Sequence, residues 1–206
     1  MQITNKLFFF LTVALLGVST ACKTTSNAPS AQASAISLGV VEGVVKVNGA
    51  VAQAGLALKS GDSIEASGEA FADIYYNDGS KVRIANGRAA IGATTKGIAL
   101  RLIVGKLYSW ISPGTSYEVN TTTAVAGVRG TKFFTEVKES KTYFCVCEGS
   151  IWTRPALAKD AAETVVKAGQ DLYVLADANE SDPVDSPGMV DMLNPVFDDM
   201  AARTAK

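Results

Sequence analysis

Two cysteines separated by one residue are the most reactive side chains in the interior of this chain. Cys145 and Cys147 lie in a run of β-forming residues, and on a strand both sulfur atoms would lie on one face. Three interpretations are open: buried thiols that pack as small apolar groups, a strained redox-labile pair, and a soft-metal or haem-linked site. We favour the buried thiols, because further metal ligands are not evident and same-strand neighbours lie near the upper limit for a strain-free disulfide.

Arg129 is the second candidate for chemistry, because it lies between glycines in the segment 123–131, TAVAGVRGT. A guanidinium beside exposed backbone N–H groups could bind an anion, so Gly127, Arg129 and Gly130 are possible ligand or partner residues. A structural role is the favoured interpretation. The two glycines would permit positive φ angles, and Arg129 would tie the loop to carbonyls or a carboxylate. On that interpretation, replacing Arg129 with alanine lowers thermal stability more than it changes any surface interaction.

The remaining polar residues do not form a catalytic pattern. The chain contains no histidine, which removes the usual Ser-His and Cys-His nucleophiles and the commonest zinc sites. Aspartates and glutamates are scattered, without a spacing that predicts an acid–base pair. Residues 78–80, Asp-Gly-Ser, are explained by the needs of a tight hairpin turn rather than by a metal or phosphate site. We therefore expect a protein that is not an enzyme, with no catalytic residue, no assigned metal and no cofactor.

The first 22 residues are typical of an exported bacterial lipoprotein. Lys6 precedes an apolar run at residues 7–18, which is short for a permanent membrane span, and residues 19–21 are small. Small residues directly before Cys22 resemble a lipobox. The sequence therefore predicts a signal peptide at residues 1–21 and a covalent lipid on Cys22. The alternative is ordinary signal cleavage, which would give a soluble secreted protein.

The predicted lipid would anchor the protein in a membrane. Lys23 lies where lipoproteins retained in the inner membrane commonly carry aspartate, so the analogy favours the outer membrane, with the domain facing the periplasm or the cell surface. Residues 22–37 are mostly small and polar, and we expect a flexible tether there. The formal net charge is -1 and the basic residues are spread along the chain, so we expect no nucleic-acid partner.

Residues 38–175 are expected to form one all-β domain. Hydrophobic residues make up 48% of the chain, which argues against disorder. Alternating apolar and polar residues flank the turn at 77–80, and short strands with turns recur without a sustained helical period. The Glu-Gly turn at 42–43 also recurs at 148–149, which favours stacked or facing layers. The pattern predicts a two-layer β-sandwich or a short β-solenoid of many short strands.

Residues 176–206 are expected to be an appendage to this domain. An acidic, proline-containing linker comes first, at residues 176–188. Val190, Leu193, Val196, Phe197 and Met200 then follow at helical spacing, interrupted by a proline. We expect a short amphipathic C-terminal helix that caps an open end of the β domain, with docking to a partner as the alternative.

The segment 123–131 closely resembles the motif of the FecR-like domain family, named for a periplasmic regulator of ferric-citrate uptake. The strand at 132–137, the turn at 147–151 and the early pattern Leu-x-x-Gly-Asp-x-Ile at 58–64 are also similar to the family. The resemblance covers residues 39–174 and implies an all-β, somewhat solenoid-like fold in the cell envelope. The best-known members carry an anti-sigma segment and a transmembrane helix that we do not find in this sequence, so we do not transfer their signalling role.

Two functional hypotheses follow from the sequence. The first is a non-enzymatic envelope lipoprotein whose FecR-like β domain binds a protein or an envelope polymer. The second is a sensor or accessory component of iron or haem uptake or signalling. In that case Cys145 and Cys147, or the loop of Arg129, would recognise a ligand.

Overall fold

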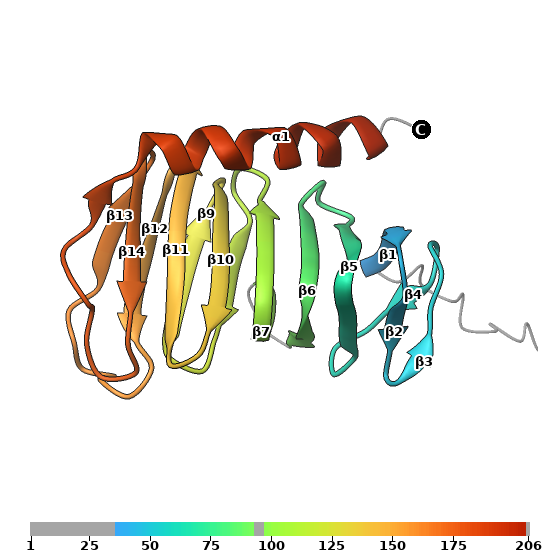
Figure 1. Ribbon diagram of the computed structural model, residues 1–206, viewed down its shortest axis with the longest axis horizontal. Helices are drawn as coiled ribbons and strands as arrows, with labels where there is room; N and C mark the ends of the chain where they lie inside the picture. Colours follow the sequence, from blue (N-terminus) through green and yellow to red (C-terminus); the bar gives the residue numbers. More distant parts are fainter. Residues whose placement is uncertain (1–35, 93–96, 205–206) are drawn as a thin grey trace, which may run out of the picture. The chain divides into compact units, whose positions relative to one another are not determined.

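The computed structural model describes residues 36–92 and 97–204, which contain fifteen β-strands and one α-helix (Figure 1). The predicted signal peptide, the lipid site at Cys22 and the tether as far as residue 35 lie outside the described residues. The strands are β1 (Ile36–Glu42), β2 (Val45–Val47), β3 (Ala50–Val51), β4 (Ala57–Leu58), β5 (Ser63–Tyr76), β6 (Lys81–Gly92), β7 (Ile98–Trp110), β8 (Ser116–Asn120), β9 (Ala124–Arg129), β10 (Lys132–Lys138), β11 (Lys141–Glu148), β12 (Ser150–Pro155), β13 (Thr164–Lys167), β14 (Gln170–Val174) and β15 (Val184–Asp185), and the helix is α1 (Pro187–Thr204).

This composition confirms the predicted all-β fold with a short C-terminal helix. The strands form one mostly antiparallel sheet that does not close into a barrel. The first strand begins at Ile36, two residues before the predicted start of the domain. The predicted linker contains the short strand β15, which pairs with β14.

The sheet turns back on itself at β7. Residues 98–101 of this strand pair with β8 in parallel, whereas residues 105–110 pair with β10 in antiparallel fashion. The bend lies at Gly105, which has a φ of 93°, and opposite it the pairing of β6 shifts register. One path of strands therefore continues as β8, β9, β12 and β13, which we call the open layer, and the other as β10, β11 and β14, which we call the helix-side layer.

The two layers enclose a common apolar core, and Figure 1 shows β9, β12 and β13 behind β10, β11 and β14. Tyr117 of the open layer packs edge-to-face on Phe133 of the helix-side layer, with 6.1 Å between ring centroids. A buried threonine cluster also joins the layers: the hydroxyl of Thr142 lies 2.7 Å from that of Thr121 and 2.6 Å from that of Thr123. Because each buried hydroxyl has a partner, the cluster fixes the spacing of the layers without unpaired polar groups.

The helix α1 runs along the ends of the strands, from β14 and β11 at one side to β6 and β5 at the other (Figure 1). Its buried residues Leu193 and Phe197 pack with Phe134, Tyr143 and Cys145 in a second apolar cluster, separate from the core between the layers. Phe134 and Tyr143 belong to β10 and β11, so α1 covers part of an outer face. The sequence predicted a helix that caps an open end of the domain, and the structure adds that its apolar stripe packs on outward-facing aromatic residues, which the sequence could not assign to a face.

A chain of ion pairs fixes the C-terminal half of α1 to β5 and β6. The fully buried Asp73 accepts two hydrogen bonds from Arg83, at 2.6 and 2.9 Å. The same guanidinium lies 2.8 Å from Asp199 of the helix, and Asp199 also pairs with Arg203. Burial by itself lowers the pKa of Arg83, but its bonds with Asp73 and then Asp199 raise that pKa above its ordinary value.

We expect the substitution Asp73→Ala to lower the free energy of unfolding by about 3–5 kcal/mol, because it removes the bidentate partner of a buried guanidinium. Urea unfolding followed by circular dichroism measures the change. Lys141→Ala removes the exposed ion pair with Glu180 and serves as the control, with an expected loss of about 0–1 kcal/mol. Equal losses from the two substitutions would show that the buried pair stabilises the fold no more than an exposed one.

Candidate functional site

The outer face of the open layer carries the motif that the sequence singled out. Successive residues of a strand point to opposite faces, so Tyr117, Val128 and Ile151 lie in the core while their neighbours face outward. Across the strands, Trp152 pairs with Gly127 on one side and with Val165 on the other, and Gly127 pairs with Glu118. These four residues form a row across the outward face of β13, β12, β9 and β8.

Gly127 provides space for the ring of Trp152. A Cβ atom on Gly127 would lie 2.2 Å from Cζ2 of the tryptophan, closer than two carbon atoms can approach. The indole therefore lies directly against the backbone of β9. The expected positive φ is found at Gly130, where it is 63°, but not at Gly127. The prediction for Gly127 is corrected, because the residue is needed for a close side-chain approach rather than for an unusual backbone conformation.

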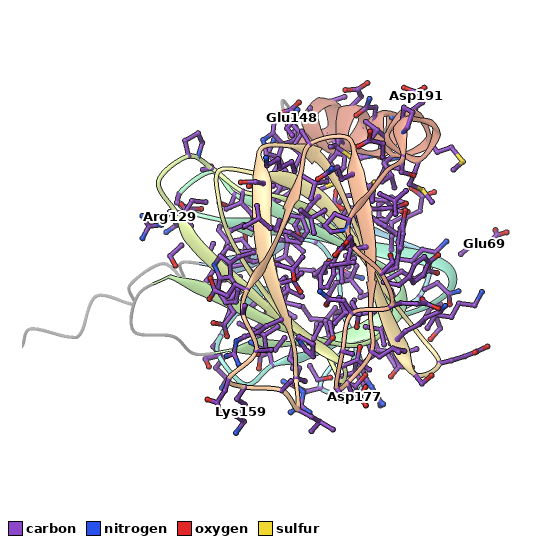
Figure 2. All side chains as sticks on the ribbon, turned by 90° about the vertical axis from the view of Figure 1, so that its left-hand side faces the viewer. Glu69, Arg129, Glu148, Lys159, Asp177 and Asp191 are labelled. Carbon is purple, nitrogen blue, oxygen red and sulfur yellow. The ribbon has the colours of Figure 1, made fainter. Side chains whose placement is uncertain are left out.

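Arg129 points away from the protein. It is exposed, and Figure 2 shows its side chain projecting outward from the strands. Its guanidinium makes no hydrogen bond or ion pair with the described residues, so the expected tie to a carbonyl or carboxylate is absent there. The loop is held instead by Thr131, whose hydroxyl donates to the carbonyl of Ser150 at 3.1 Å and whose carbonyl accepts from the amide of Ile111 at 3.0 Å.

A shallow hollow of about 490 Å³ opens over this row. Trp152 and Val165 supply its apolar part, and Glu118 and Arg129 supply its charges. Small hydroxyl-bearing residues flank the arginine at Ser116 and Ser150, which also line the hollow.

The outward face around the hollow is positively charged. Strand pairing places four cationic side chains on it, and the single carboxylate is Glu118, which accepts a 2.7 Å hydrogen bond from the side chain of Asn120. These counts cover the outward residues of the open layer and of the part of β7 paired to it. The four cations are Arg101, Arg129, Arg154 and Lys167.

Trp152 is half-buried, and an exposed aromatic side chain on the helix-side layer, Tyr173, has a different environment. The amine of Lys141 lies 4.4 Å from the ring centroid of Tyr173. Glu180 already neutralises that amine at 3.1 Å. The charge of Lys141 is therefore already neutralised next to Tyr173, whereas the guanidinium of Arg129 remains available to an incoming group.

The two cysteines lie beneath α1. Cys145 and Cys147 are free thiols, Cys145 is fully buried, and both contact the cluster that includes Leu193. The hydrogen bond between them, followed by burial, raises the pKa of Cys147. Within the described ranges, no group of three or more His, Cys, Asp or Glu side chains is placed to hold a metal ion. The buried sulfur of Cys145 would be reached only after displacement of the helix, whereas Cys147 is partly exposed.

Sequence reasoning found Arg129 but missed Trp152, Glu118 and Val165. The alternation along residues 150–153 places Trp152 outward while Ile151 and Thr153 are buried, so the local pattern contained this information. Its contact with Gly127 joins residues on different strands. No local pattern could reveal that contact.

Comparison with known proteins agrees with the observed fold. Residues 62–151 match the family model described as FecR protein, so this stretch is a FecR domain, as the resemblance indicated. Two crystal structures, at 1.65 and 2.50 Å resolution, of a candidate anti-sigma factor from Parabacteroides distasonis have a similar fold, each with a TM-score of 0.50 and 14% identity. Each match covers 60% of this chain and 59% of the solved chain. No curated protein matches this chain.

The described residues include no helix with the length and apolar content needed to cross a membrane.

We expect Gly127→Ala to reduce stability by about 1–3 kcal/mol, because the new methyl group must displace the ring of Trp152. In a Trp152→Ala background the same change should be neutral or stabilising by up to about 1 kcal/mol, since alanine suits a strand better than glycine. Chemical unfolding of the four proteins gives the coupling between the two positions. Equal effects of Gly127→Ala in both backgrounds would show that the ring does not rest on this residue.

The exposed position of Arg129 reverses the expectation from sequence. Arg129→Ala should change the free energy of unfolding by no more than about 0.5 kcal/mol, because the side chain stabilises no described neighbour. Thermal and urea unfolding of the two proteins measure this difference. A loss similar to that expected for Asp73→Ala would restore a structural role for the guanidinium.

Proposed function

We propose that this protein is a non-enzymatic binding module of the cell envelope and that it binds its partner through the outward face of the open layer. The observation that carries this proposal is the indole of Trp152, which lies on Gly127 beside the unpartnered guanidinium of Arg129. Tryptophan and arginine are the residue types that most often dominate binding energy at interfaces.

The contrast between the two outer faces supports this choice. On the helix-side layer, α1 covers Phe134 and Cys145, and the charged groups near Tyr173 neutralise one another. On the open layer, Arg129 has no described partner and Val165 is 51% exposed. The half-buried ring of Trp152 and the exposed guanidinium of Arg129 are available to bind another molecule.

The hollow also supports a binding role rather than catalysis. Its one carboxylate, Glu118, already accepts a hydrogen bond from Asn120. Ser116 and Ser150 have no neighbouring base in the hollow that would activate them as nucleophiles, and the chain contains no histidine. The group of residues is suited to contact a ligand and not to move protons.

The role we propose for this binding is regulation or signalling on the envelope side of the cell. The FecR domain at residues 62–151 and the likeness of the fold to a candidate anti-sigma factor support it. The apolar run at residues 7–18 and the small residues before Cys22 support a lipid anchor on that cysteine. Lys23, which follows it, supports outer-membrane placement. The alternative, an iron or haem sensor that uses Cys145 and Cys147 or the loop of Arg129, has less support, because Cys145 is buried against α1 and the described residues hold no group of three or more potential metal ligands.

A photo-crosslinking amino acid at one of two matched valines tests the proposed face. Val165 lies at the hollow and is 51% exposed, whereas Val184 lies on β15 and is 54% exposed. In intact cells that produce the full chain, we expect a crosslinked adduct from position 165 and none from position 184. Combining the probe with Trp152→Ala and Arg129→Gln should abolish the adduct.

Crosslinking from position 184 alone would assign binding to another surface. Absence of an adduct at both positions would also contradict the proposed face. Because both probes replace an exposed valine of similar accessibility, a difference between them reports on the partner and not on the chemistry of the probe.

A further inference from the structure

We propose that the ligand of the outward face is an acidic polysaccharide, a chain of sugar rings that carries carboxylate or phosphate groups. This inference rests on the binding face proposed above and names the chemical class of its partner. Three features of the face are complementary to such a chain: a flat aromatic ring, cations on either side of that ring, and polar groups suited to hydroxyls.

The flat ring is that of Trp152. Gly127 lets the indole lie on the backbone of β9, which supports the ring from below. The face of an aromatic ring is electron-rich, and one side of a pyranose ring presents polarised C–H groups that are attracted to such a face. A sugar ring stacked here would need no deep pocket, which agrees with the open hollow above Trp152.

The cations lie on both sides of the ring along the strands. Arg129 is two residues from Gly127 on β9, and Arg154 is two residues from Trp152 on β12, in the opposite direction across the face. Each step of two residues is about 7 Å along a strand. An acidic group on a sugar next to the stacked one would therefore come within reach of a guanidinium, which binds carboxylate and phosphate with two hydrogen bonds.

The remaining polar groups are suited to sugar hydroxyls. Ser116 and Ser150 can donate or accept on either side of Arg129, and the paired side chains of Glu118 and Asn120 can do so beyond Gly127. Only Val165 adds a large exposed apolar side chain beside Trp152. The core of a protein–protein interface is usually more apolar than this, so a protein partner fits the face less well.

Nucleic acid also fits less well. The face has one aromatic platform, whereas proteins that bind single strands stack successive bases on several. The chain carries a formal net charge of -1, without the basic excess that phosphate backbones require.

Calorimetric titration of the purified protein tests the proposal with two acidic probes, polygalacturonate and polymannuronate, both of which are chains of pyranose rings that carry carboxylates. We expect at least one to bind, and Trp152→Ala or Arg129→Gln to weaken that binding about ten-fold or more, a loss of about 1.4 kcal/mol each. Tyr173→Ala and Lys138→Gln are the matched controls, since they remove an exposed aromatic ring and an exposed cation from the helix-side layer. Both controls should bind within about two-fold of the unmodified protein.

Three outcomes would overturn the proposal: no binding of any acidic probe, equal binding of the neutral glucan cellohexaose, or equal binding of poly-glutamate. The last would show that charge alone is recognised. If position 165 crosslinks a protein in cells while no probe binds, the binding face stands and the polysaccharide assignment fails. If position 165 crosslinks nothing and no probe binds, both fail.

Discussion

The close contact of two strands at Gly87 and Gly105 makes one sheet into two layers. A Cβ atom on Gly105 would lie 2.1 Å from the carbonyl oxygen of Asn86, and one on Gly87 would lie 2.3 Å from that of Val104. Only glycine fits at both positions, so β6 and β7 can bend together there and send β8 and β10 into opposite layers. The bend thereby places Phe133 against Tyr117 and turns the other sides of both layers outward.

The two outward faces that result carry different residues, and only one of them is covered by the helix. One carries aromatic residues and thiols that need a cover, and α1 supplies it, fixed by the ion pairs of Arg83 with Asp73 and Asp199. The other carries Trp152, whose ring packs on Gly127 of the neighbouring strand and is not covered by another element of the described residues. The binding face proposed here depends on that difference, because a rigid aromatic ring with one side on the backbone is fixed in place before a ligand arrives.

The elements of this fold could be predicted from sequence where the information is local. The turn at 77–80 and the alternation on either side of it are local features, and the strands β5 and β6 are found at that place. The positive φ of Gly130 was also expected and is observed. The face covered by α1 and the contact of Trp152 with Gly127 could not be predicted, because both depend on which strands become neighbours. Arg129 was identified by its setting between glycines, yet its outward direction is decided by the register of β9 against β12.

Radical footprinting in intact cells is the most direct test of the claim that the open layer faces a partner and the helix-side layer does not. Oxidation of Trp152 and Tyr173, one aromatic residue on each outer face, would be compared between cells and purified protein. The account predicts that Trp152 is protected in cells while oxidation of Tyr173 is unchanged. Equal oxidation of Trp152 in both samples, or protection of Tyr173 alone, would contradict it.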